Sequence, residues 1–174
     1  SIPASIGNLA SLETIYLQNN RLTSAVPAEI VQLIQLRQLN FSNNLLTSTI
    51  PAEIGQLELL RVVDLSKNRL TGSLPNEIGN CKQLEKLNLT ENTLTSSIPA
   101  TMVQLTLLKE LWLPGNKLTS SIPPVLGNLK LLKQLVLEFN QLTGTIPSEL
   151  GGLSSLEGLG LRSNKLTSSI PPVL

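Results

Sequence analysis

Hydrophobic positions recur along this 174-residue chain with a period of 24 residues, and the polar positions between them keep the same phase. The full pattern is Leu84-x-x-Leu87-x-Leu89-x-x-Asn92-x-Leu94-Thr95-x-x-Ile98-Pro99. Its asparagine recurs in seven copies, at Asn20, Asn44, Asn68, Asn92, Asn116, Asn140 and Asn164. A fixed period of this length predicts a solenoid, in which each coil contacts only its neighbours.

Each copy predicts one short β-strand ahead of its asparagine. In the first copy, between Leu12 and Asn20, Ile15 and Leu17 alternate with polar or amphipathic residues. Alternation with a period of two is typical of a strand that buries one face. The equivalent segments predict six further strands, at residues 36–44, 60–68, 84–92, 108–116, 132–140 and 156–164. We expect these strands to be parallel and to form one sheet.

The residues after each strand predict a turn, a second extended piece and a short helix. An asparagine amide both donates and accepts hydrogen bonds, so a stacked asparagine ladder can satisfy backbone groups in its own coil and in the next one. The Leu-Thr-Ser/Gly segment predicts the extended piece, and each proline suits the first turn of a helix or 3₁₀ segment. Glycine suits the end of that helix at positions 7, 55, 79, 127 and 151. Val31 and Val103 replace this glycine, so those two turns must close differently.

The repeated pattern closely resembles the plant-type leucine-rich repeat, and the resemblance covers the whole chain. It implies an α/β solenoid, a right-handed curved or superhelical stack with a parallel β-sheet on its concave face and short 3₁₀ or helical turns on its convex face. The family usually places glycine after the threonine, as at Gly72 and Gly144. Serine stands there at Ser24, Ser48, Ser96, Ser120 and Ser168. We expect residues 1–174 to form a single solenoid of about seven repeats, uncapped at both ends and part of a longer chain.

Composition narrows the possible partners. Aromatic residues make up only 2% of the chain, so the core must consist of stacked aliphatic side chains, with Cys81 in the phase of a core leucine. Thirteen basic and twelve acidic residues give a net charge of +1 without any run of like charge, which argues against nucleic acid as a partner. No apolar run is long enough to cross a bilayer, so we expect no membrane contact within this segment.

The residues needed for common catalytic and metal sites are scarce. Histidine is absent, Asp64 is the only aspartate, and the single thiol lies in the core phase. A carboxylate pair formed by Asp64 and Glu85 on neighbouring strands remains arithmetically possible, but an open sheet offers no deep cleft to raise one pKa. We therefore predict that the protein is not an enzyme and has no cofactor or metal site.

The exposed strand positions differ between copies, and variation on a constant scaffold predicts a binding surface. Trp112 is the only tryptophan, and its phase points it to solvent beside Val136 and the side-chain-free Gly158 and Gly160. An exposed aromatic residue next to an apolar strip has the composition of an interaction hot spot. The alternative is a tryptophan that merely lies on its neighbours. The predicted ligand-binding residues are Trp112, Val136, Glu110, Gln134, Lys86, Glu138 and Phe139.

Two glycosylation sequons lie in the same strand column as Trp112. They are Asn40-Phe41-Ser42 and Asn88-Leu89-Thr90, 48 residues apart. Because members of the resembled family are mostly extracellular recognition proteins, we expect a secreted or cell-surface location with N-linked glycans on Asn40 and Asn88. The ligand is then a protein, a peptide or a glycan.

Two other functions fit the sequence. The repeats and glycans could build a structural glycoprotein of an extracellular matrix, cell wall or fibre, with self-association along or beside the solenoid. The third possibility is ice binding through a regular hydroxyl array, with pairs such as Thr47 and Thr49 or Thr71 and Ser73, although this threonine also belongs to the repeat pattern. A separate column of charged residues alternates in sign along the sheet: Glu13, Arg37, Arg61, Glu85, Lys109, Lys133 and Glu157.

Overall fold

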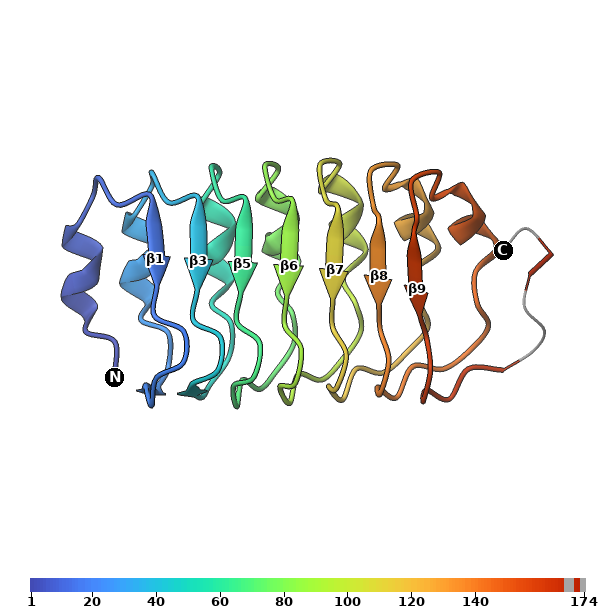
Figure 1. Ribbon diagram of the computed structural model, residues 1–174, viewed down its shortest axis with the longest axis horizontal. Coiled ribbons are helices and arrows are strands. Elements are labelled where there is room, and N and C mark those ends of the chain that lie inside the picture. The colour runs from blue at the N-terminus through green and yellow to red at the C-terminus, as the bar shows by residue number, and fades with distance from the viewer. Residues whose placement is uncertain (168–170, 173–174) are drawn as a thin grey trace.

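The computed structural model describes residues 1–167 and 171–172, so the predictions made for Ser168 and Ile170 lie outside the described residues. Within them, one parallel sheet contains seven strands whose order follows the chain (Figure 1). The strands are β1 (Thr14–Tyr16), β3 (Gln38–Asn40), β5 (Val62–Asp64), β6 (Lys86–Asn88), β7 (Glu110–Trp112), β8 (Gln134–Val136) and β9 (Gly158–Gly160). Each strand pairs with the residues 24 positions further along, which confirms the predicted sheet.

Short 3₁₀ helices form a second layer behind the sheet (Figure 1). They are η1 (Ala4–Asn8), η2 (Ala28–Gln32), η3 (Ala52–Gln56), η4 (Asn76–Asn80), η5 (Ala100–Gln104), η6 (Pro124–Asn128) and η7 (Ser148–Gly152). The prolines lie one residue earlier than predicted, because Pro51 and its equivalents have extended ψ angles and precede the helix. The fixed φ of proline still directs the chain into the helix that follows.

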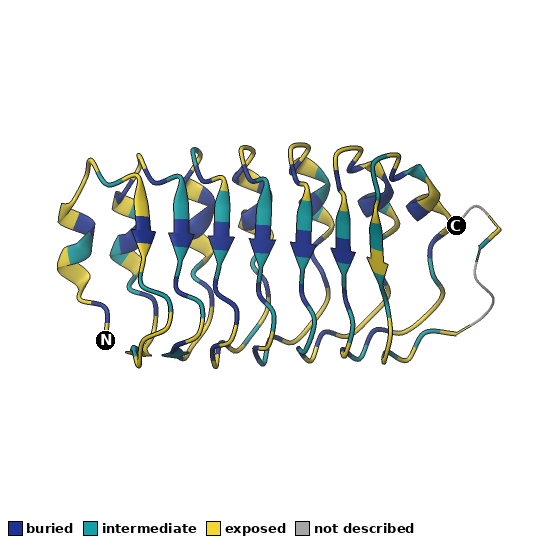
Figure 2. Cartoon of the chain, in the orientation of Figure 1, coloured by how far each residue is buried: buried dark blue, intermediate teal, exposed yellow. Residues whose placement is uncertain are grey.

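The core is a continuous aliphatic column between the sheet and the 3₁₀ helices. Figure 2 shows buried residues at the centre of the strands and on the inner side of the helices. Leu87 at the centre of β6 and Leu89 just after it are both almost fully buried, as the alternation predicted. Cys81 is also fully buried, and its Sγ lies 3.3 Å from the backbone oxygen of Ile54. The prediction that this thiol belongs to the core is confirmed.

The asparagine ladder is present, but it bonds to the preceding coil and not to the next one as predicted. The Nδ2 of Asn92 donates to the backbone oxygen of Leu89 in its own coil at 3.1 Å and to that of Leu65 in the preceding coil at 3.0 Å. Its Oδ1 accepts from the backbone nitrogen of Leu70 at 3.0 Å. Asn44, Asn68, Asn116 and Asn140 are also buried, whereas Asn20 is exposed and Asn164 is half-buried. Each internal asparagine therefore joins two coils.

The second extended piece forms a continuous ladder of backbone hydrogen bonds. The two-stranded sheet of β2 (Thr23–Ser24) and β4 (Leu45–Leu46) covers only its first coils. Beyond it, Thr71 still donates to Ser48 at 2.8 Å, and Thr119 donates to Ser96 at 2.9 Å. The residue after the threonine adopts a left-handed φ, from 67° to 75° across Ser24, Ser48, Gly72, Ser96, Ser120 and Gly144. This conformation explains the family's preference for glycine at that position.

The glycines in the 3₁₀ helices do not end them, contrary to the prediction. A Cβ atom on Gly79 would lie 2.6 Å from the backbone oxygen of Thr101 in the next coil, and one on Gly127 would overlap the backbone of Glu149. The absence of a side chain therefore lets neighbouring helices approach closely. Where Val31 and Val103 replace glycine, η2 contacts η3, and η5 contacts η6, less extensively than the glycine-bearing pairs.

Candidate functional site

The predicted binding residues gather on the concave face of β7 and β8 and at the ends of these strands. Trp112 pairs with Val136 on one side and with Asn88 on the other, so the tryptophan and the valine are direct cross-strand neighbours. Glu110 lies opposite Gln134 and forms an ion pair with Lys86, with 2.7 Å between Nζ and Oε2. The register thus places five of the seven predicted residues on three consecutive strands.

Trp112 is half-buried, and the expectation that it points freely to solvent is wrong. Its Nε1 atom is buried and has no hydrogen-bond partner among the described residues. Neighbouring strands lie only about 4.8 Å apart, so the side chains on either side enclose a large ring. An indole N–H is a donor that ordinarily finds a partner when it is buried. This N–H is therefore an unused recognition group.

The two glycines of β9 do not leave an empty hollow beside this ring. Gln134 occupies the space above Gly158, where a Cβ atom would overlap its amide. Above Gly160, a Cβ atom would lie 3.1 Å from the Cγ of Glu138 and 3.1 Å from the Cγ1 of Val136. The glycines let these three predicted residues lie low against the sheet, which forms a shallow floor next to Trp112.

Phe139 lies at the turn after β8, where its left-handed φ of 53° is unusual for a bulky residue. The side chain is 45% exposed, and the guanidinium carbon of Arg162 lies 4.6 Å from the ring centroid. This distance is typical of a cation–π contact. Arg162 and the half-buried Pro114 were not among the predicted site residues. The same 24-residue step from Glu138 reaches both, so the repeat register could have found them.

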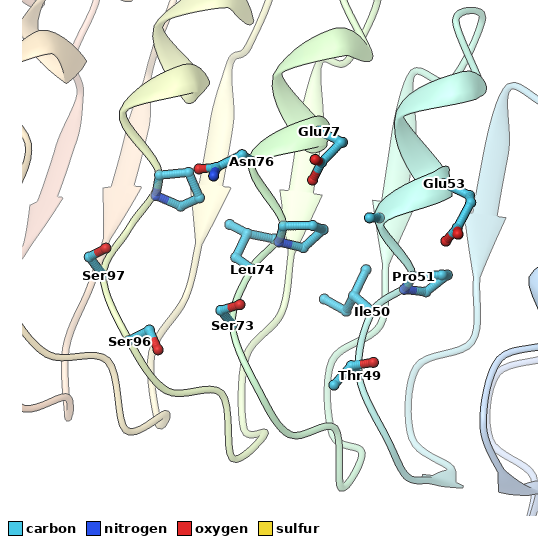
Figure 3. Close-up of a pocket in the computed structure, with 13 residues that line it drawn as sticks. Thr49, Ile50, Pro51, Glu53, Ser73, Leu74, Asn76, Glu77, Ser96 and Ser97 are labelled. Carbon is cyan, nitrogen blue, oxygen red and sulfur yellow. The ribbon is translucent and has the colours of Figure 1, made fainter.

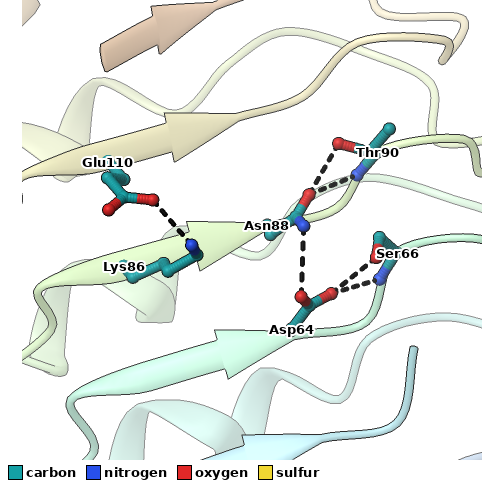
Figure 4. A network of polar contacts seen from close by, with 6 residues as sticks. All are labelled: Asp64, Ser66, Lys86, Asn88, Thr90 and Glu110. Atoms are coloured by element: carbon teal, nitrogen blue, oxygen red, sulfur yellow. Dashed lines mark hydrogen bonds and ion pairs between the residues drawn. The ribbon is translucent and has the colours of Figure 1, made fainter. Parts of the chain in front are cut away.

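The N-terminal part of the concave face is polar, and its side chains bond to one another (Figure 4). Asp64 Oδ1 accepts hydrogen bonds from the backbone nitrogen of Ser66 at 3.0 Å and from its hydroxyl at 2.6 Å. Asn88 makes the same two bonds with Thr90 and also donates to Asp64 Oδ2 at 3.2 Å. Both carboxylate oxygens of Asp64 are thus engaged, so the earlier pairing of Asp64 with Glu85 does not form.

The charged column forms ion pairs as its alternating signs predicted. Glu13 pairs with Arg37, and Lys133 pairs with Glu157. Glu85 pairs with both Arg61 and Lys109, and the hydrogen bond from Lys109, with support from Arg61, lowers the pKa of the Glu85 carboxyl. A general acid needs a raised pKa, so this shift has the wrong direction for that role.

The hydroxyl array borders a groove on the flank of the solenoid (Figure 3). The paired threonines and serines are exposed, as predicted, but the left-handed residue between them turns the chain there. Thr49, Ser73 and Ser97 line this groove of about 710 Å³ together with Glu53 and Glu77. The array therefore lies on a hollowed surface and does not present the flat face on which the ice-binding hypothesis depends.

The described residues contain no group of three or more histidine, cysteine, aspartate or glutamate side chains suited to hold a metal ion. None of the helices in the described part of the chain is long and apolar enough to cross a membrane.

A model of the leucine-rich repeat region matches residues 52–171, and a second leucine-rich repeat model matches residues 10–70. The chain belongs to the leucine-rich repeat family. No curated protein sequence matches this leucine-rich repeat chain.

Several solved structures share the fold of this leucine-rich repeat chain closely. The plant peptide hormone receptor RGFR1 in complex with RGF2 has 40% identity and a TM-score of 0.98 over 99% of this chain and 28% of the receptor. The ectodomain of the Arabidopsis thaliana receptor kinase GASSHO1/SCHENGEN3, in complex with CASPARIAN STRIP INTEGRITY FACTOR 2, has 38% identity and a TM-score of 0.96, over 98% and 20%. The Arabidopsis receptor kinase HAESA, in complex with the peptide hormone IDA and the co-receptor SERK1, has 32% identity and a TM-score of 0.90, over 99% and 33%. The chain thus spans a third or less of each matched structure.

Proposed function

We propose that this protein is an extracellular or cell-surface recognition module, without enzymatic activity, that binds a peptide segment on its concave face beside Trp112. The similar structures support this assignment, because two of them are described as receptors in complex with a peptide hormone or its named ligand. They also favour recognition over the structural-glycoprotein alternative. The location follows from the same likeness, since one neighbour is described as the ectodomain of a plant membrane receptor kinase.

The buried, unpartnered N–H of Trp112 is the observation that carries this proposal. A peptide backbone supplies carbonyl oxygens at regular intervals, and one of them can accept the indole hydrogen bond. The low floor above Gly158 and Gly160 allows an extended chain to lie close to the sheet. Val136 and Pro114 provide half-buried apolar surface next to the ring. Hydrogen bonding and apolar burial therefore act at the same place.

Peptide selection on the unglycosylated protein tests this assignment. A random peptide library displayed on phage is selected against protein produced in bacteria, and the affinity of each synthetic peptide is then measured by calorimetry. Trp112→Ala should weaken binding at least about 30-fold, as expected for a hot-spot residue. Trp112→Phe keeps an aromatic ring but removes the N–H, and it should weaken binding about 5-fold or more.

Tyr16→Ala is the matched control, because Tyr16 occupies the same strand column on β1, at the other end of the sheet. It should leave the affinity unchanged within about twofold. Selected peptides that bind the wild type and Trp112→Ala equally well contradict the proposed site. A selection that yields no peptide specific for the wild-type protein contradicts peptide binding itself.

A further inference from the structure

We propose that Asn40 and Asn88 carry N-linked glycans that cover the concave face from β3 to β6 and confine a ligand to β7–β9. This inference rests on the extracellular location in the proposed function. The two asparagines end β3 and β6, and Asp64 ends the strand between them. At about 4.8 Å per strand, the two attachment points lie about 10 Å apart on one face.

The local geometry leaves the reactive amide of Asn40 free. Its Oδ1 accepts hydrogen bonds from the backbone nitrogen of Ser42 at 3.0 Å and from the Ser42 hydroxyl at 2.7 Å. These two bonds fix the side chain through its oxygen. Its Nδ2 donates to no described residue and is not buried. A sugar attached to Nδ2 therefore breaks no contact of the folded chain.

Asn88 is held in the same way by Thr90, and one of its amide hydrogens also bonds to Asp64 (Figure 4). Transfer from a lipid-linked diphosphate oligosaccharide breaks the sugar C1–O bond, and the diphosphate leaves with the electron pair. A C1–Nδ2 bond forms, and the amide releases one proton. The glycosylated amide keeps its second hydrogen, which is sufficient for the bond to Asp64. The folded structure therefore accepts both glycans.

The arrangement of polar groups agrees with this division of the face. From β3 to β6, the side chains that end the strands bond to residues of their own chain and offer few free partners to a ligand. The next strand ends in Trp112, whose N–H is unpartnered. N-glycans are bulky and strongly solvated, so they exclude a macromolecular ligand from the surface below them. The Asn88 glycan then marks the edge of the ligand site.

Asp64 provides a built-in comparison for the experiment, because it makes the same turn but cannot accept a glycan. The full protein is secreted from eukaryotic cells, and peptide-N-glycosidase treatment followed by mass spectrometry reads the occupancy of each site. The wild type should carry two glycans. Asn40→Asp and Thr90→Val should each remove one, and Asp64→Asn should add a third because it precedes Leu65 and Ser66. A bare Asn40 or Asn88 in the wild type overturns the proposed modification.

Peptides selected on the bacterial protein then test the division of the face. Their affinity for the glycosylated protein should agree within about twofold with their affinity for the unglycosylated one. A loss of affinity that the double variant Asn40→Asp, Thr90→Val restores shows that the glycans cover the ligand site, and it overturns the division. The glycan masses need no ligand, so failure of this inference is distinguishable from failure of the proposed function.

Discussion

Replacement of Asn92 by alanine tests whether the asparagine ladder stabilises the stack by joining neighbouring coils. The side chain is only 6% exposed and bonds to both its own coil and the preceding one. Alanine leaves the backbone nitrogen of Leu70 without its Oδ1 acceptor and the backbone oxygen of Leu65 without its Nδ2 donor. Both residues are almost completely buried, so water cannot replace these partners.

The expected loss of stability follows from these two groups. A buried backbone group without a partner costs about 1–3 kcal/mol, so the pair gives about 4 kcal/mol for Asn92→Ala. Asn20→Ala is the matched control, because Asn20 has the same repeat position but is exposed and donates only to Leu17 and Gln18 of its own coil. Water can solvate those carbonyl oxygens, and the control should cost less than about 1 kcal/mol.

Urea unfolding measures both variants. Trp112 lies one coil after Asn92 and provides a fluorescence signal close to the change, while circular dichroism reports on the whole stack. The free energy of unfolding should fall about 3 kcal/mol further for Asn92→Ala than for Asn20→Ala. Equal losses for the two variants refute the reasoning, because they mean that the bonds to the preceding coil do not contribute.

Two further predictions concern single side chains. Ser48→Gly should stabilise the protein by about 0.5–1 kcal/mol in urea unfolding because φ is 74° there, whereas Ser73→Gly, at a position without positive φ, should destabilise it by a similar amount. A shift in the same direction for both variants contradicts the left-handed strain. Burial raises the pKa of the Cys81 thiol from 9.0 to about 12, so the unfolded chain ionises first and stability falls as pH rises through this window. Between about pH 9 and 10 the wild type should lose about 1 kcal/mol relative to Cys81→Ala, and parallel pH profiles of unfolding free energy contradict this.

The repeat period predicted the fold because every copy must fill the same position in the stack. The core phase of Leu87 and Cys81, the parallel register and the paired charges all follow from adding 24 to a residue number. The direction of the asparagine bonds did not follow. The coils before and after Asn92 present the same chemical groups, so the pattern alone does not show which of them receives the amide. Backbone geometry decides this, and only the structure contains it.

The candidate site was predicted in its position but not in its details. Phase placed Trp112 beside Val136 correctly, because cross-strand neighbours are fixed by register. Phase could not show that the indole nitrogen is buried, since that depends on the rotamer and on the size of the adjacent side chains. The role of the helix glycines was missed for a related reason. Gly79 contacts Thr101 of another coil, and helix-end rules consider only the helix itself.

Hydrogen-bond accounting explains why binding energy should concentrate at one end of an otherwise regular surface. A ligand that covers Asp64 or Asn88 must compete with bonds that these side chains already make within the chain, so it gains little. A ligand that covers Trp112 supplies a missing acceptor and removes apolar surface from water in the same step. Each coil has the same scaffold, and the difference between its ends lies in which exposed groups are already satisfied. The scaffold therefore makes all strands equally available, and the unpaired donor on β7 selects the site.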